Sequence, residues 1–206
     1  MTGKAYANGR TGFARWALGS VAHTLVHQST VPVLVLRQGE TLTSLTNPDG
    51  AHPLCVLVPL DGSLLAEAAL VPALSLTSAL ATPTRGALHL VQVVKPVSSP
   101  VEEGFVSEFN EEACRLASTY LATMAESVQA AAGHTLTLTT SVETGTDVAS
   151  TLLSLIEHGS SGEYGLIAIS THGRGGLERW VMGSVTERLL TTTKLPMLIV
   201  RPPKKA

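Results

Sequence analysis

The sequence is poor in several residue types, and each shortage excludes a class of protein. Its two cysteines, Cys55 and Cys114, are too few for a disulfide framework and lack the spacing of a zinc site. Lysine and arginine total 14 against 16 acidic residues, so a net charge of −2 gives no basic field for nucleic acid. No apolar run reaches the length of a membrane span, and no signal segment opens the chain. We therefore expect a cytoplasmic protein without nucleic-acid or membrane partners.

An internal repeat is the most informative feature that is present. Residues 9–21 recur as residues 173–185, and the register holds without a gap through residues 31–37 and 195–201. The two copies share two glycines ten residues apart, an Arg-Trp pair between them and a final apolar segment that ends in arginine. Chance similarity would not keep these features in step, so the pattern indicates a duplication.

The surroundings of the two copies suggest a domain organisation. The second copy ends a long alternation of strand and helix signals, whereas the first begins almost at Met1. The chain thus resembles a two-domain protein that keeps only the last loop, helix and strand of its first domain. We predict that remnant at residues 1–38, a polar, turn-rich linker at 39–53 and a complete domain at 54–206.

The order of local signals in residues 54–206 predicts an α/β fold. Apolar or β-branched runs at 54–60, 87–94, 135–142, 166–170 and 197–200 indicate strands. Helical patterns separate them at 64–81, 108–132, 147–158 and 184–193, with a break expected at Pro72 and a cap at Asp147. This alternation is typical of a doubly wound, flavodoxin-like parallel sheet, here five-stranded in the order 3-2-1-4-5 and preceded by the helix–strand remnant.

A glycine-rich loop after the fourth strand carries the candidate chemistry. Glycines allow backbone N–H groups to approach an anion, and a helix that starts near Ser184 adds unpaired N–H groups. Asp61 follows the first strand, and ligands of such sheets sit where the first and fourth strands diverge. Two structural alternatives stay open. The loop could be a plain turn, and Ser184 with Glu187 matches a capping box that needs no ligand.

The same loop resembles the signature of the universal stress protein family. ATP-binding members carry glycine, two residues, glycine, nine residues, and then Gly-Ser or Gly-Thr. Here Gly173 and Gly183 enclose nine residues and Ser184 follows, while Ser170 replaces the first glycine. Residues 58–63 and 91–96 are also similar to the first and second strands of the family. The resemblance covers residues 54–202 in full and residues 9–37 as a partial second copy.

The resemblance implies a set of ligand-binding residues. Pro59, Leu60, Asp61, Val93 and Ile169 would surround the nucleoside. Ser170, His172, Gly173, Arg174, Gly183, Ser184 and Val185 would lie in or beside the phosphate loop. The implied ligand is ATP with Mg²⁺ or Mn²⁺, and no protein metal cage is expected. The partial copy lacks a counterpart of Asp61 and a strand before its loop, so we expect it to be structural.

Three functions follow from these features. The leading one is an ATP-binding stress regulator, and the alternative is a scaffold of the same family that dimerises without binding nucleotide. An enzyme is the least favoured, because the Gly-Lys-Ser/Thr pattern of phosphate-binding ATPases is absent. Family members associate through their last strands, so residues 31–36 are expected to pair with residues 197–200, within one chain or between chains.

Overall fold

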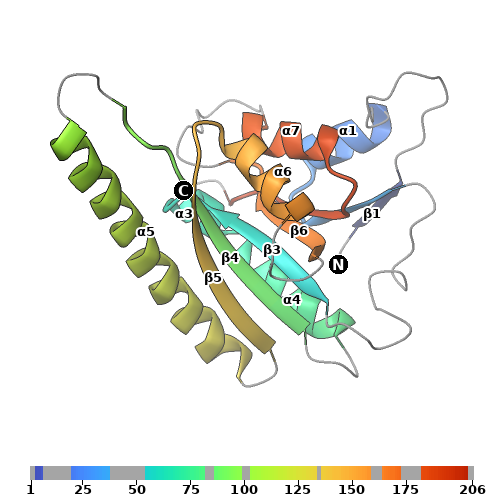
Figure 1. The fold of residues 1–206 in the computed structure, drawn as a ribbon. Helices are drawn as coiled ribbons and strands as arrows, with labels where there is room; N and C mark the ends of the chain where they lie inside the picture. The colour runs from blue at the N-terminus through green and yellow to red at the C-terminus, as the bar shows by residue number, and fades with distance from the viewer. Residues whose placement is uncertain are drawn as a thin grey trace.

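The computed structural model describes residues 3–6, 20–37, 54–81, 86–98, 103–133, 136–158, 164–172 and 182–203. These residues form an α/β fold in which one sheet lies between two layers of helices (Figure 1). All of its pairings but one are parallel. The predicted fold class is therefore confirmed at this level.

The sheet has more strands than predicted. Seven described strands pair in the order β1-β2-β7-β6-β3-β4-β5, so the prediction of a five-stranded sheet was wrong in number and in complete order. The five strands after residue 54 keep the relative order 3-2-1-4-5, and two N-terminal strands extend the sheet beyond β7. The strands are β1 (Gly3–Tyr6), β2 (Val33–Leu36), β3 (Cys55–Leu60), β4 (Gly86–Val94), β5 (Leu136–Thr144), β6 (Tyr164–Ser170) and β7 (Met197–Val200).

Two apolar clusters fill the space between the sheet and the helices. Helices α3 (Leu64–Glu67), α4 (Leu70–Leu80) and α5 (Glu103–Ala132) bury residues in the first cluster. Helices α1 (Ser20–Gln28), α6 (Val148–His158) and α7 (Ser184–Thr192) bury residues in the second, on the opposite face. The parallel strands β3 and β6 are apolar along nearly their whole length because both of their faces are covered.

The repeat in the sequence is also a repeat in the structure. Strand β1 pairs with β2 from Gly3↔Val33, and adding 164 to both numbers gives Ile167↔Met197, the first pair between β6 and β7. Helices α1 and α7 coincide under the same shift, because 20 + 164 = 184 and 28 + 164 = 192. A strand thus precedes the first glycine loop, which corrects the expectation that it had none.

The two copies meet at β2 and β7, which pair antiparallel within this chain. Leu34 lies opposite Leu198, its own counterpart under the 164-residue shift, so a local twofold relation passes between them. The side chain of Arg37 donates to the carbonyl of Leu190 in α7 at 2.9 Å, and Arg201 donates to the carbonyl of His27 in α1 at 2.9 Å. The two arginines are equivalent under the same shift, because 37 + 164 = 201. Each binds the carboxyl end of the helix in the other copy, where cations are favoured.

Two helix boundaries differ from the predictions. The break that Pro72 was expected to cause lies one turn earlier, at Ala68 and Ala69, because Pro72 has no N–H for the Ala68 carbonyl and its ring clashes with that group. Helix α5 starts at Glu103, five residues earlier than predicted, so Gly104 is helical. The connection before it is held to the helix by Asn110, whose side chain bonds both the N–H and the carbonyl of Val97.

Candidate functional site

A large crevice opens at the carboxyl ends of β3, β4 and β6. Its volume is about 1160 Å³, and the start of α7 forms the wall opposite β3. Helices α5 and α6 close its sides, with Ala117 and Leu152 among the lining residues. The crevice lies where β3 pairs with β4 on one side and with β6 on the other, which is the switch point at which open α/β sheets bind ligands.

The corner after β3 fixes the orientation of Asp61. Its Oδ1 accepts hydrogen bonds from the Ser63 N–H at 3.0 Å and from the Ser63 hydroxyl at 2.6 Å. Gly62 between them has φ +79°, a conformation that favours glycine. The Ser63 oxygen in turn accepts from the Ala66 N–H and caps α3. The Asp61 carboxylate is therefore held rigidly on the crevice wall, and it has a structural role in addition to any contact with a ligand.

The end of β6 is tied to the start of α7 through backbone and hydroxyl groups. Ser170 is 4% exposed, its hydroxyl accepts from the His172 N–H at 3.3 Å, and its carbonyl accepts from the Thr186 hydroxyl at 2.8 Å. Nearby, the Gly183 N–H donates to the Thr171 carbonyl at 2.8 Å. These bonds place the first turn of α7 directly against the end of β6.

The amino end of α7 faces the crevice without a side-chain cap. The N-cap residue is Gly183, in an extended conformation and with no side chain to accept from the helix, so the predicted capping box of Ser184 and Glu187 does not form. A Cβ at Gly183 would lie 3.2 Å from the Thr171 carbonyl oxygen, which makes glycine the best fit. The N–H groups of the first turn have no partner within a helix, so they are suited to an anionic ligand.

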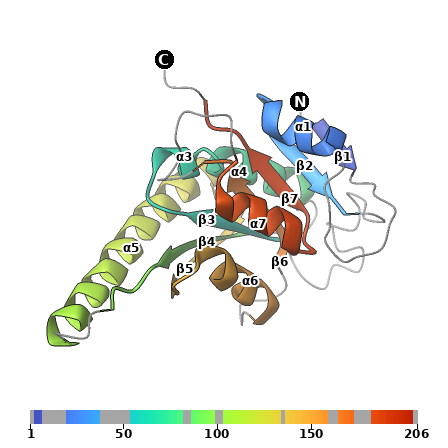
Figure 2. The same cartoon turned by 90° about the horizontal axis from the view of Figure 1, so that it is seen from above.

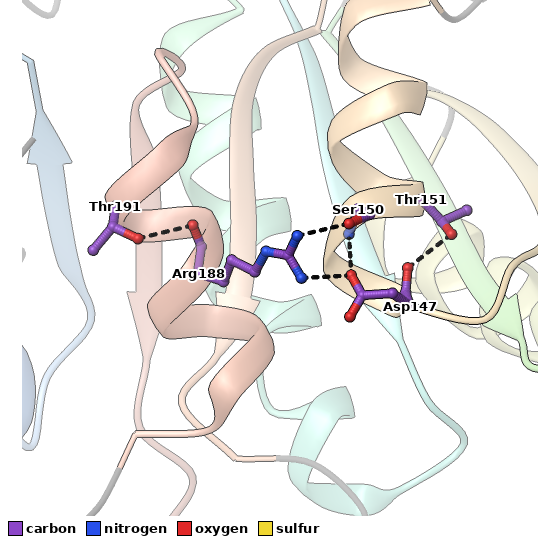
Figure 3. Close-up of polar contacts among 5 residues, drawn as sticks. All are labelled: Asp147, Ser150, Thr151, Arg188 and Thr191. Carbon is purple, nitrogen blue, oxygen red and sulfur yellow. Dashed lines mark hydrogen bonds and ion pairs between the residues drawn. The ribbon is translucent and has the colours of Figure 1, made fainter. Parts of the chain in front are cut away.

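Helices α6 and α7 are joined by polar contacts between residues that do not themselves line the crevice (Figure 3). Arg188 of α7 donates to the Asp147 carboxylate at 2.7 Å and to the Ser150 hydroxyl at 2.8 Å. Asp147 Oδ1 also accepts from the Ser150 N–H, which confirms Asp147 as the cap of α6. That N–H, followed by the Ser150 hydroxyl, is the main reason why the pKa of Asp147 is lowered, and the charges of Arg188 and Lys95 add to it.

The comparison with protein families decides the identity of the chain. The profile of the Universal stress protein family matches two segments, residues 6–37 and residues 55–201. This chain belongs to the universal stress protein family. Each matched segment contains one copy of the repeat, and the second also contains the rest of the domain that starts at residue 55. No relative was found among the curated proteins.

Solved structures of universal stress proteins share the fold. UspA from Lactobacillus plantarum superposes with a TM-score of 0.62 at 20% identity, over 73% of this chain and 99% of that one. Universal stress proteins from Archaeoglobus fulgidus and Pseudomonas aeruginosa give TM-scores of 0.59 and 0.60, at 22% and 17% identity. The latter two matches cover 96% and 98% of this chain but only 62% and 63% of theirs, so this chain spans less than two thirds of their length.

The crevice gathers most of the residues that the resemblance implied. Ten of the twelve line it, whereas Gly173 and Arg174 fall outside the described residues. The ten are Pro59, Leu60, Asp61, Val93, Ile169, Ser170, His172, Gly183, Ser184 and Val185. None of the described parts of the chain brings together three histidine, cysteine, aspartate or glutamate side chains that could hold a metal ion. In those same parts no helix combines the length and the apolar content that a bilayer span needs.

Sequence reasoning missed the residues that the helices contribute to this universal stress protein crevice. Those from α5 are Ala113, Leu116, Ala117 and Tyr120, and Val148 and Leu152 come from α6. Lys95, Thr171, Thr186 and Glu187 also line it, from positions beside the predicted ones. The helical spacing of 113, 116, 117 and 120 could have indicated one helix face, but no local signal says that this face meets the crevice.

Proposed function

We propose that this protein binds one ATP molecule in the crevice and acts as a regulator in the universal stress protein family. The observation that carries the proposal is the open amino end of α7, which faces Asp61 across the cavity and is held there by Gly183 and Thr186. A helix start without a side-chain cap suits a phosphate, and a rigid carboxylate suits a ribose hydroxyl or a base edge.

The lining of the crevice supports a division into a nucleoside end and a phosphate end. The nucleoside would contact Pro59, Leu60, Asp61, Val93 and Ile169, which lie at the carboxyl ends of β3, β4 and β6. The phosphates would receive N–H groups from the turn at Gly183, Ser184 and Val185. Mg²⁺ or Mn²⁺ would then be held chiefly by phosphate oxygens and water, as such ions usually are in nucleotide sites.

The proposed role is regulation and not turnover. Efficient phosphoryl transfer needs a base or a water-orienting group beside the transferred phosphate. His172 lines the crevice, and its Nδ1 lies 2.8 Å from the Thr171 hydroxyl, so one ring nitrogen is already engaged. A regulator needs only that the nucleotide favour one of two forms of the protein, since differential affinity is what shifts an equilibrium.

We further propose that residues 1–38 derive from the end of a first universal stress domain, joined by residues 39–53 to the complete domain 54–206. The common 164-residue shift of sequence, helices and strand register supports this origin. In this chain the segment covers the edge of β7 through β2, the place where a second chain could otherwise pair. The N-terminal segment would thereby replace a dimer partner.

One observation favours the alternative of a scaffold that binds no nucleotide. Ser170 stands where ATP-binding members have glycine, and it is buried beside the turn with its hydroxyl bonded to the His172 N–H. A side chain at this position narrows the approach of a phosphate to the backbone. The scaffold would keep the fold and the β2–β7 junction and would leave the crevice without a nucleotide.

Isothermal titration of the nucleotide-stripped chain with Mg-ATP tests the proposal. We expect one site per chain, and we expect Asp61→Ala to weaken binding at least about 10-fold because it removes a charge-assisted hydrogen bond. Asp147→Ala is the matched control, because it also removes a carboxylate that accepts hydrogen bonds at the start of a helix but lies outside the crevice lining. Thermal unfolding of both variants without ligand separates lost binding from lost folding.

Absence of heat in the wild type would contradict ATP binding and leads to a second titration with Ser170→Gly. Binding by that variant alone would show that the Ser170 side chain blocks the site, and the wild type would then be the scaffold. Ser170→Ala serves as its control, because it removes the hydroxyl without adding the backbone freedom of glycine. No binding by any of the three would also leave the scaffold as the function.

A further inference from the structure

The amino-terminal half of α5 projects beyond the sheet. A helix of 30 residues is about 45 Å long, whereas the nine-residue strand β5 beside it spans about 30 Å. Its described buried side chains begin only at the middle of the helix, with Ala117, Leu121 and Val128. None of the described side chains from 106 to 116 is buried. Figures 1 and 2 show this end of the helix standing clear of the other elements.

An apolar stripe runs along this projecting half. It consists of Phe109, Ala113, Leu116 and Tyr120, whose spacing of four, three and four residues places them on one helix face. Phe109 is 62% exposed and Leu116 is 56% exposed, although both are large apolar side chains. Ala113, Leu116 and Tyr120 also line the crevice, so the α5 stripe is continuous with its mouth. Tyr120 is fixed there by a hydrogen bond to Glu67 at 3.0 Å.

A second segment widens the apolar surface beside the stripe. Val97 in the connection after β4 is 49% exposed and is held to α5 by its two hydrogen bonds with Asn110. Isolated exposed apolar side chains are normal on a protein surface, but a contiguous group on one projecting element marks an interaction site. Three of the exposed large apolar side chains of the described residues belong to this one region.

The charges that border the stripe are acidic. Glu108 and Glu112 are exposed along one edge of the stripe, Glu111 lies on the opposite side of the helix, and Arg115 is the only basic residue between 106 and 117. Three glutamates and one arginine leave a net charge of 3 − 1 = 2 negative on this segment. Arg115 is moreover engaged with Glu112 through an ion pair on the helix surface. A ligand of the stripe therefore meets apolar contacts with negative charge along one edge.

We propose that the α5 stripe is a docking site for a basic amphipathic helix of a partner protein. Apolar anchors at i, i+4 and i+7 match the contacts that a helix makes when it lies against another helix. Lysines or arginines beside the partner's apolar face would meet the glutamates, which gives orientation and a faster association at low salt. The site lies at the mouth of the crevice, but docking requires no nucleotide and stands independently of ATP binding.

A labelled model peptide tests the docking site. The probe is an 18-residue helix of leucine and lysine with every leucine on one face, and the control peptide has the same composition in scrambled order. Fluorescence anisotropy with the full chain should show binding of the amphipathic probe at least about 10-fold tighter than the scrambled peptide, and weaker binding as salt rises. Equal binding of the two peptides, or none, would overturn the proposal.

Two sets of variants locate the site on the chain. The double variant Phe109→Ser/Leu116→Ser should weaken the probe at least about 10-fold, because apolar anchors dominate such interfaces. The matched control is Leu25→Ser/Val71→Ser, which also removes two exposed apolar side chains but from α1 and α4. Glu108→Gln/Glu112→Gln should lower the dependence of affinity on salt, because these two glutamates lie along the edge of the stripe. Equal losses in both double variants would contradict the assignment to α5.

Two further measurements keep this proposal separate from its competitors. Without peptide, the wild type and Phe109→Ser/Leu116→Ser should have the same association state in sedimentation. If the wild type self-associates and the double variant does not, the stripe binds a second copy of this chain, and the proposal of a basic partner fails. The Asp61→Ala variant should bind the probe as the wild type does, so a failure of ATP binding and a failure of docking are distinguishable.

Discussion

His89 is a buried titratable side chain in the middle of β4. It is 3% exposed, and its two ring nitrogens lie 2.8 Å from the Thr139 hydroxyl and 3.0 Å from the Ser141 hydroxyl of β5. Its ring also packs beside Tyr164, with centroids 5.7 Å apart. Burial lowers the pKa of His89, and the negative charge of Glu143 opposes this shift only in part. The folded state therefore prefers the neutral imidazole.

This preference predicts a loss of stability in mild acid. Because the folded-state pKa lies below the unfolded value of about 6.5, the neutral ring contributes stability above that pH, and the contribution is lost as pH falls through the folded pKa. His89→Gln keeps a hydrogen-bond donor and an acceptor at this position. It should lower the free energy of unfolding by about 1 kcal/mol at pH 7 because it packs less well. It should also flatten the decline of that free energy between pH 7 and pH 5. Urea unfolding at several pH values measures both effects.

The control for this prediction is His158→Gln, which changes an exposed histidine at the end of α6. It should keep the decline that the wild type shows between pH 7 and pH 5. If His89→Gln and the wild type lose stability in parallel over that range, protonation of His89 is not the cause of the decline.

The motif residues of the crevice could be predicted from sequence, because their positions are set by local backbone needs. Asp61 follows the end of a buried strand, and Gly183 stands where a Cβ would approach the Thr171 carbonyl. The prediction of a capping box at Ser184 was wrong for a related reason. Its four-residue pattern does not reveal that the helix starts one residue earlier, with Gly183 as N-cap. Leu116 and Tyr120 could not be assigned to the crevice, since the packing of α5 on the sheet decides their position.

At the scale of elements, apolar runs predicted the buried strands well. The β1 strand was missed, because its four residues Gly3–Tyr6 contain no apolar run and the strand depends on pairing with β2. Helix α5 was predicted too short, because Gly104 near its start is a poor helix former and indicates a loop. Both errors arise where tertiary contacts or helix-end effects outweigh the local pattern.

The contact between α6 and α7 predicts which of two substitutions, Asp147→Ala or Arg188→Ala, lowers thermal stability more. Asp147→Ala removes both the cap of α6 and the ion pair with Arg188, whereas Arg188→Ala removes only the pair and a bond to the Ser150 hydroxyl. Caps contribute more than exposed ion pairs do, so Asp147→Ala should lower the thermal midpoint clearly and Arg188→Ala only slightly. Differential scanning calorimetry measures both midpoints.

The pH dependence of the same contact provides an independent check. The lowered pKa of Asp147 means that its contribution is present above the unfolded-state value and is lost as pH falls through the folded value. The thermal midpoints of the two variants should therefore approach that of the wild type in acid. A larger effect of Arg188→Ala than of Asp147→Ala at pH 7 would show that Arg188 stabilises the contact chiefly through a group other than Asp147, such as the Ser150 hydroxyl.

At the scale of the whole molecule, the N-terminal segment completes the sheet. Met197, Leu198 and Ile199 of β7 are almost fully buried, with β6 on one side and β2 on the other. Every described residue that lines the crevice lies between Pro59 and Glu187, so the described parts of the N-terminal segment, residues 3–6 and 20–37, contribute none of them. The segment thus supports the edge of the fold and leaves the proposed nucleotide site to the rest of the chain.

Removal of residues 1–37 should therefore change assembly more than ligand binding. Without β2, the edge of β7 exposes its backbone and apolar side chains, and two copies can pair antiparallel about Leu198, as Leu34 and Leu198 now pair within one chain. Light scattering after size exclusion should find the full chain as a monomer and the shortened chain as a dimer or larger aggregate. If the full chain binds Mg-ATP, the affinity of the shortened chain should stay within about threefold of the full-chain value, because distant sites act nearly independently. A shortened chain that remains monomeric and soluble would mean that β2 does not protect this edge, and the segment would then need another explanation.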